Sequence, residues 1–264
     1  MAHSGFLATD RAVLRISGKD HARFLQDLVT NDLAGLKSGA VYAGLLTPQG
    51  KYLFDFFMLP DEDAILIDVK QDRAAALAQR LSMYKLRAAV TIETSDCAVV
   101  QVFGDQPTGD RVFADPRSAA LGWRVYTDAP EQVLAGLDAA SADDWTRLRV
   151  ENLIPETGVE LKSDDSYILE QGFERLNGVD FRKGCYVGQE VTARMKHKTE
   201  LRKGLARVRI DGALPDVGTK IVNDDKDVGE ILSGSGTLAL AYLRFDRAEG
   251  PLRAGDAVVE LEQR

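Results

Sequence analysis

One short segment with apolar side chains at almost every position restricts the fold of this chain most. It reads Lys51-Tyr52-Leu53-Phe54-Asp55-Phe56-Phe57-Met58-Leu59. In an extended strand the side chains alternate between two faces. The first face is expected to carry Tyr52, Phe54, Phe56 and Met58. The second face is expected to carry Leu53, Asp55, Phe57 and Leu59. Because both faces are apolar, the segment predicts a strand that is buried on both sides.

Asp55 is the one carboxylate inside this apolar segment. A buried charge costs several kcal/mol unless hydrogen bonds or an opposite charge compensate for it. Two interpretations are open. The carboxylate is held by a buried ion pair or by the backbone of a loop, or it faces a ligand that carries N–H donors, as reduced pterins do.

The pattern of predicted elements changes near residue 200. Before that point strands and helices are mixed, with a hairpin over residues 41–59, a helix that starts at Asp72 and a helix that runs from about residue 141 to Pro155. After it the sequence contains only short β-like runs between turns, over residues 205–210, 220–222, 228–232, 238–243 and 257–261. Such runs predict a small barrel or sandwich. We therefore expect an α+β chain with a β domain at residues 201–264.

Composition argues against several classes of protein. The chain has 264 residues, of which 45% are hydrophobic and 28% charged, as is ordinary for a soluble globular protein. No apolar run approaches the ~20 residues that span a bilayer, and the N-terminus lacks the pattern of a signal peptide, so we expect a cytoplasmic protein without a membrane partner. The two cysteines, Cys97 and Cys185, and the three histidines show no metal-ligand spacing, so no intrinsic metal is expected.

The charge distribution is uneven. A formal net charge of −8 argues against a general nucleic-acid binder. Basic side chains nevertheless outnumber acidic ones between residues 182 and 203, where Arg182, Lys183, Arg194, Lys196, Lys198, Arg202 and Lys203 accompany Glu190 and Glu200. This stretch is either a solvated helix face or a local site for an anion such as a carboxylate tail, a phosphate or RNA.

The most specific motif is an octapeptide that contains the second cysteine. It consists of Lys183, Gly184, Cys185, Tyr186, Val187, Gly188, Gln189 and Glu190. Its two glycines permit a tight turn and a close approach of the backbone to a ligand. Because residues 189–196 are predicted to be helical, Cys185 would precede a helix N-terminus beside the cations of Arg182 and Lys183, and both features favour its thiolate. The alternative, a small buried residue at a turn, is also open.

The octapeptide resembles the signature K-G-C-[FYW]-x-G-Q-E of YgfZ-type proteins, most of all the branch that includes mitochondrial iron–sulfur assembly proteins. Residues 177–179 and 191–194 on either side agree as well. Phe24–Leu33 resembles the F-L-x-x-L-x-T-N-D-L segment of the parent superfamily, which includes the T-protein of the glycine cleavage system. Residues 228–234 and 238–242 resemble its C-terminal barrel. The resemblance covers most of the chain and is weakest between residues 104 and 140.

The resemblance implies a folate-binding, aminomethyltransferase-like fold. We expect two intertwined α/β subdomains within residues 1–200, roughly 20–95 and the rest, and a small C-terminal β-barrel at 201–264. The implied cofactor is tetrahydrofolate or a derivative. Asp55 falls where the superfamily places the carboxylate that contacts folate. Tyr42 and Asp68 fall near other folate-lining positions, although the transferases usually have Asn where this chain has Asp68.

The function implied by the resemblance is support of iron–sulfur cluster assembly or repair and, through iron–sulfur enzymes, of tRNA modification. Folate and iron–sulfur client or assembly proteins are the implied partners, and Cys185 is the implied redox-active or transient ligand thiol. The transferases lack this cysteine motif and are longer, which argues against a classical enzyme. The alternative is a folate-dependent aminomethyltransferase in which Asp55 acts as the acid–base or electrostatic group. Direct binding of tRNA is a third hypothesis, against which the net charge argues.

Overall fold

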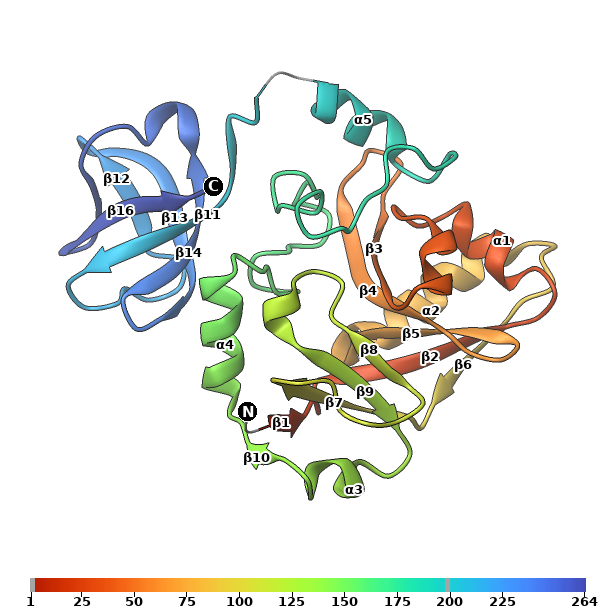
Figure 1. The fold of residues 1–264 in the computed structure, drawn as a ribbon. Helices are drawn as coiled ribbons and strands as arrows, with labels where there is room; N and C mark the ends of the chain where they lie inside the picture. The colour runs from red at the N-terminus through yellow and green to blue at the C-terminus, as the bar shows by residue number, and fades with distance from the viewer. Residues whose placement is uncertain (1–2, 198–199) are drawn as a thin grey trace. The chain divides into compact units, whose positions relative to one another are not determined.

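The structure is a computed structural model that describes residues 3–197 and 200–264, so Lys198 of the predicted basic stretch lies outside the described residues. The chain forms two compact units (Figure 1). One comprises Met1–Ser141 and Glu174–Gln189, and the other comprises Ala142–Phe173 and Glu190–Arg264.

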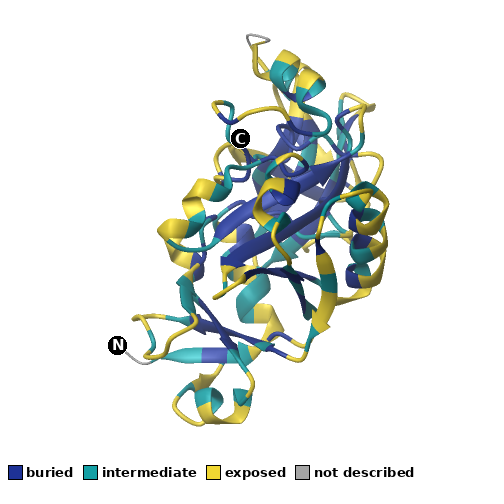
Figure 2. Ribbon diagram, turned by 90° about the vertical axis from the view of Figure 1, so that its right-hand side faces the viewer, coloured by how far each residue is buried: buried dark blue, intermediate teal, exposed yellow. Residues whose placement is uncertain are grey.

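A five-stranded antiparallel sheet, here called the first sheet, forms the centre of the first unit. Its strands lie in the order β3 (Val41–Leu46), β4 (Tyr52–Pro60), β5 (Ala64–Lys70), β2 (Arg11–Ser17) and β6 (Thr91–Ser95). Every residue of β4 from Tyr52 to Leu59 is buried, and Figure 2 shows the central strands buried along their lengths. The prediction of a strand buried on both faces is confirmed.

Two different layers cover the first sheet. On one face the apolar side chains pack against α1 (His21–Gln26), the 3-10 helix η1 (Leu33–Lys37) and α2 (Gln71–Lys85). The opposite face shares a core with the second sheet, in which Leu59 and Leu66 meet Val99 and Tyr126. The second sheet has the order β10 (Asp138–Ala139), β1 (Ser4–Leu7), β7 (Ala98–Phe103), β9 (Trp123–Thr127) and β8 (Val112–Ala114). The outer face of the second sheet is covered by residues of α3 (Pro130–Leu134).

The alternation predicted for β4 is wrong at its first two residues. Leu45 pairs with Phe54, but the next residue of β3, Leu46, pairs with Tyr52, so Leu53 is an extra residue on β4. Such a bulge shifts the preceding side chain relative to the alternation of the strand. As a result Leu53 lies in the same core as Phe54, and Tyr52 reaches toward Asp55.

The second unit contains a closed barrel, a helix that packs on it and a second helix. The barrel strands are β11 (Lys203–Asp211), β14 (Leu238–Arg244), β13 (Lys226–Ser235), β12 (Lys220–Asn223), β15 (Leu252–Ala254) and β16 (Ala257–Gln263), in that order. Its interior is apolar. The helix α4 (Ala142–Glu151) packs on the barrel through Val150, which meets Leu205 and Leu240. The prediction that short strands near the end of the chain form a small barrel or sandwich is thus confirmed, and the structure is a barrel. The strand β15 was not predicted.

The expected α+β class is confirmed, with two sheets and a six-stranded barrel. The domain limits predicted at residues 200 and 20–95 stay predictions. None of the helices within residues 3–197 and 200–264 combines the length and the apolar character needed to cross a membrane.

Candidate functional site

Two tyrosine hydroxyls hold the carboxylate of Asp55. Tyr52 Oη donates to Oδ1 at 2.6 Å, and Tyr42 Oη donates to Oδ2 at 3.0 Å. Asp55 is 5% exposed and Tyr42 is 0% exposed. Hydroxyl groups are suitable donors to a buried carboxylate. The carboxylate of Asp55 thus accepts hydrogen bonds from tyrosine side chains, which neither interpretation of the sequence included. The contact of Asp55 with a ligand stays a prediction.

The hydroxyl of Tyr42 remains a hydrogen-bond donor throughout the neutral pH range. Burial raises its pKa well above the ordinary value, and the negative charge of Asp55 raises it further. Arg117 acts in the opposite direction but does not outweigh these effects. Tyr42 therefore keeps the proton that it donates to Asp55 near neutrality.

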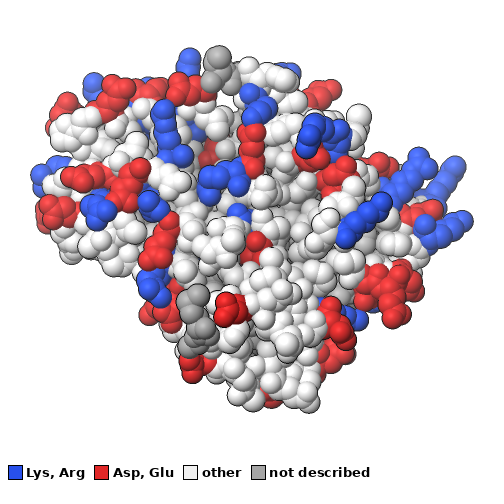
Figure 3. Space-filling model, in the orientation of Figure 1, with Lys and Arg blue, Asp and Glu red and all other residues white. Residues whose placement is uncertain are grey.

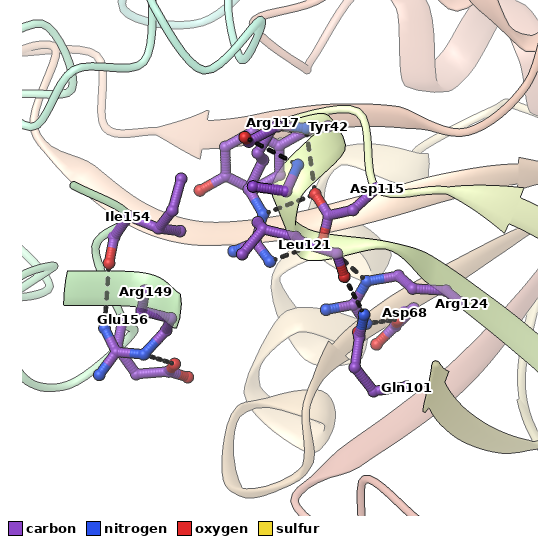
Figure 4. A network of polar contacts seen from close by, with 12 residues as sticks. Tyr42, Asp68, Gln101, Asp115, Arg117, Leu121, Arg124, Arg149, Ile154 and Glu156 are labelled. Atoms are coloured by element: carbon purple, nitrogen blue, oxygen red, sulfur yellow. Dashed lines mark hydrogen bonds and ion pairs between the residues drawn. The ribbon is translucent and has the colours of Figure 1, made fainter. Parts of the chain in front are cut away.

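A guanidinium group covers the aromatic rings beside Asp55. The Cζ of Arg117 lies 5.5 Å from the ring centroid of Tyr42 and 4.7 Å from that of Phe57. Asp115 accepts hydrogen bonds of 3.0 Å from Arg117 Nε and 2.8 Å from Nη2 (Figure 4). Contacts between a guanidinium and aromatic faces are favourable, and the ion pair holds Arg117 in this position.

Asp68 lies in a buried ion-pair network. Its Oδ1 accepts from Arg11 Nε at 2.6 Å, and its Oδ2 accepts from Tyr126 Oη at 2.7 Å. Oδ2 also accepts from Arg124 Nη1 at 2.8 Å (Figure 4). Burial raises the pKa of Asp68, but the guanidinium groups of Arg11 and Arg124 outweigh it and hold the pKa below its ordinary value. Asp68 thus has a clear role within the fold, and its contact with folate stays a prediction.

The register of the first sheet brings the three predicted folate residues to one face. Tyr42 on β3 pairs with Phe57 on β4, and Phe57 pairs with Asp68 on β5. Asp55 precedes Phe57 by two positions on β4 and shares its face. The structure therefore places Tyr42, Phe57 and Asp68 in a row across three neighbouring strands, and Asp55 accepts a hydrogen bond from Tyr42.

Cys185 lies at the surface. Its thiol is exposed, whereas that of Cys97 is buried. The helix predicted after Gly188 is confirmed as α5 (Gln189–His197). The interpretation of Cys185 as a buried turn residue therefore does not fit, and its reactivity stays a prediction.

The ammonium group of Lys183 is bound by backbone carbonyl oxygens. It donates to the carbonyl oxygens of Gln26 at 2.7 Å, Val29 at 2.5 Å and Asn31 at 3.1 Å. The charge of Lys183 is thus directed to these carbonyls, and the expectation that it supports a thiolate at Cys185 stays a prediction.

The two glycines of the octapeptide have different surroundings. Gly188 has φ +84°, and a Cβ there would lie 2.6 Å from the carbonyl oxygen of Thr47 and 3.1 Å from the Cα of Gly50. Only glycine fits this close approach to the turn between β3 and β4. Gly184 has no positive φ, and a Cβ there would meet none of the described atoms within 4 Å. The fold accounts for Gly188 but gives no steric reason for Gly184.

Residues 30 and 31 connect the carboxylate site with the segment that precedes the octapeptide. Thr30 Oγ1 donates to the carbonyl of Gly178 at 2.6 Å. Asn31 Nδ2 donates to the carbonyl of Tyr42 at 2.8 Å and to that of Asn177 at 2.6 Å. The strand that carries Tyr42 and the segment that leads to Cys185 are thereby joined through two polar side chains.

Sequence reasoning did not single out Tyr52, Arg117 or Arg124 as parts of the site. Tyr52 was missed because simple alternation placed it on the face opposite Asp55. The two arginines belong to the region where the resemblance is weakest. Arg124 carried a usable signal, because it is a cation within residues 121–126, an apolar run that predicted a strand.

Among the residues that the structure describes, no three or more His, Cys, Asp or Glu side chains are grouped to hold a metal ion. On the face drawn in Figure 3, acidic and basic side chains are interspersed. The role of the basic stretch at residues 182–203 stays open.

Comparisons with known proteins agree with the sequence analysis. Residues 202–264 match the sequence family described as CAF17, C-terminal beta-barrel domain. The chain is 34% identical to the mitochondrial iron–sulfur cluster assembly factor IBA57 of Mus musculus, over 96% of this chain and 80% of that protein. It is 31% identical to the IBA57 of Homo sapiens, over 94% of this chain and 79% of that protein.

A solved structure shares the fold. The crystal structure of the glycine cleavage system aminomethyltransferase T from Bartonella henselae superposes with a TM-score of 0.82 at 13% identity, over 100% of this chain and 85% of that one. The predicted aminomethyltransferase-like fold is confirmed. The two IBA57 relatives are named as mitochondrial, so the cytoplasmic location expected for this chain stays a prediction.

Proposed function

This chain belongs to the IBA57 family of iron–sulfur cluster assembly factors, and we propose that it supports the assembly or repair of iron–sulfur clusters as a folate-binding protein. The predicted kinship with YgfZ-type proteins and with the fold of the T-protein is confirmed. The observation that carries the proposal is the exposed thiol of Cys185 within the complete octapeptide. An exposed thiol is available to a partner protein or to a cluster, whereas a buried one is not.

The proposed folate site is the face that bears Tyr42, Asp55 and Phe57. Reduced pterins carry N–H donors, and the carboxylate of Asp55 accepts hydrogen bonds. Aromatic rings suit a flat heterocycle. Arg117 covers the rings of Tyr42 and Phe57, so the proposal includes a displacement of this guanidinium when folate enters.

The proposed role of Cys185 is that of a redox-active or transient ligand thiol for a cluster in transit to a client. A thiolate is the form that ligates iron. Because this chain would handle clusters as cargo, no resident metal site is needed. A link to tRNA modification would then follow through iron–sulfur enzymes rather than through direct binding of tRNA.

Folate binding is tested by anaerobic calorimetric titration of tetrahydrofolate into the wild type, Asp55→Asn and the matched control Asp96→Asn. Asp96 is an exposed carboxylate of the same unit, so its variant should bind as the wild type does. We expect micromolar binding that is lost in Asp55→Asn. If the folded wild type does not bind tetrahydrofolate, the folate part of the proposal is wrong.

The cluster role is tested separately by complementation. Cells that lack their own member of the family receive the wild type, Cys185→Ala or Cys97→Ala, and the activity of iron–sulfur enzymes is measured. We expect activity with the wild type and with Cys97→Ala but not with Cys185→Ala. Full activity with Cys185→Ala would contradict the proposed role of the thiol.

An activity assay with anaerobic tetrahydrofolate tests the alternative, in which the chain is a folate-dependent aminomethyltransferase. Formation of methylene-tetrahydrofolate from an aminomethyl donor, abolished by Asp55→Asn, would favour the enzyme over the assembly factor. We expect no turnover.

A further inference from the structure

The ammonium group of Lys183 is enclosed by backbone oxygens of one short stretch. Lys183 is 7% exposed, and its three acceptors are the carbonyls of Gln26, Val29 and Asn31. Gln26 is the last residue of α1, and the other two lie between α1 and η1. Carbonyls at and beyond a helix C-terminus lack donors from their own helix, and a lysine can supply them.

Residues 184–187, here called the thiol loop, follow Lys183, and the C-terminal end of this loop is fixed as well. Tyr186 is buried, and its ring centroid lies 5.3 Å from Nζ of Lys183. Gly188 follows directly and packs closely on the turn at Thr47 and Gly50. Gly184 and Cys185, between these anchors, are exposed. The loop is therefore held at both ends, while the thiol remains accessible.

We propose that Lys183 is a positioning residue, whose ammonium group acts as a built-in cation that fixes the thiol loop on the connection between α1 and η1 and so determines where Cys185 is presented. The biological consequence rests on the proposed function of Cys185, but the anchoring itself does not. Three acceptors around one nitrogen match the three N–H donors of an ammonium group. The planar fork of an arginine does not reproduce this arrangement.

A nitroxide spin label on Cys185 reports the motion of the loop directly. The label should react selectively, because Cys97 is buried. We expect a slow-motion spectrum for the wild type and a markedly narrower one for Lys183→Met, which keeps the chain length but lacks donors. Lys19→Met is the matched control, since it removes an exposed cation of the same unit; its spectrum should equal that of the wild type.

Hydrogen exchange measures the size of the effect. Loss of charge-assisted hydrogen bonds should raise the exchange rates of the amides at residues 184–187 by at least about tenfold. Amides of the barrel should not change. A spectrum and exchange rates of Lys183→Met that equal those of the wild type would overturn the proposal.

Chemical rescue separates positioning from a general loss of structure. Lys183→Ala deletes three methylene groups and the amine, which n-propylammonium replaces. We expect n-propylammonium, but not 1-propanol, to restore the slow-motion spectrum. If the variants do not fold alone, recovery of the fold by n-propylammonium supports the proposal, and the absence of any recovery overturns it. Neither the spin-label spectrum nor the exchange rates require folate or a client protein. The anchoring role of Lys183 can therefore be tested even if the proposed function proves wrong.

Discussion

Thr30 Oγ1 donates a 2.6 Å hydrogen bond to the carbonyl of Gly178, which lies 148 positions further along the chain. The same oxygen accepts from the amide of Gly44 at 2.8 Å. Thr30 is fully buried, and Gly44 pairs with Asp55 on the neighbouring strand. One hydroxyl group therefore connects the strand opposite Asp55 with the segment that leads to the octapeptide.

Removal of this hydroxyl should destabilise the protein. Thr30→Val keeps the shape but leaves two buried backbone groups without their partner, so we expect the free energy of unfolding to fall by roughly 2–4 kcal/mol. Thr30→Ser keeps the hydroxyl and loses one methyl group, which should cost about 1 kcal/mol. Urea unfolding followed by circular dichroism measures both. Equal losses for the two variants would mean that packing, and not the hydrogen bonds, accounts for Thr30.

The sequence predicts those parts of the fold that depend on local patterns. Burial of β4, the helix α2 and the helix that follows Gly188 could all be read from periodicity and turn residues. The short strand β15 could not, because three residues between glycine-containing turns show no pattern. The bulge at Leu53 was also hidden, since pairing with β3 and not the sequence of β4 creates it.

The site was predictable only where it rests on one strand or one motif. Asp55 stood out as a lone carboxylate in an apolar run, and Cys185 stood out in its octapeptide. Arg117 and Arg124 contact Phe57 from segments far along the chain. Such contacts depend on how two sheets pack together, and no local pattern encodes that packing.

The two glycines of the octapeptide should respond differently to alanine. Gly188→Ala places a Cβ against the backbone of Thr47 at a positive φ, so the free energy of unfolding should fall by roughly 1–3 kcal/mol. Gly184→Ala should leave stability unchanged or slightly higher. We nevertheless expect Gly184→Ala to impair complementation of iron–sulfur enzyme activity, because a partner protein would occupy the open space beside Gly184. Full complementation by a stable Gly184→Ala variant would show that this space is not used.

The two thiols should differ in reactivity. Cys185 is exposed, while burial raises the pKa of Cys97, with a further contribution from the charge of Asp128. Iodoacetamide at neutral pH should therefore alkylate Cys185 well before Cys97 in the folded protein, and both equally in urea. Peptide mass spectrometry over time measures the two rates. Equal rates at the two thiols in the folded protein would contradict this difference.

Asp68 should contribute mainly to stability. Asp68→Asn leaves Arg11 and Arg124 without their shared buried counterion, and we expect a loss of roughly 3–5 kcal/mol in urea unfolding at pH 7. Asp63→Asn is the matched control, because Asp63 pairs with Arg15 at the surface, where such pairs contribute less than about 1 kcal/mol. Since the pKa of Asp68 is lowered in the fold, the stability that it contributes is present above its ordinary pKa of 3.8 and is lost only as the pH falls below that value. A loss for Asp68→Asn as small as that for Asp63→Asn would contradict this role.

Lys183 should make stability depend on pH in the alkaline range. Burial lowers its pKa from the ordinary value of 10.5 to about 8, although the charges of Asp32, Asp27 and Asp180 raise it. Between these two pH values the unfolded chain binds a proton that the folded chain has released, so a rise in pH favours the folded state. The difference in unfolding free energy between the wild type and Lys183→Met should therefore grow from pH 7 to pH 10. Lys183→Arg stays charged throughout this range and should show no such growth relative to Lys183→Met. Parallel curves for the wild type and Lys183→Met would show that the ammonium group is not desolvated at its three carbonyls.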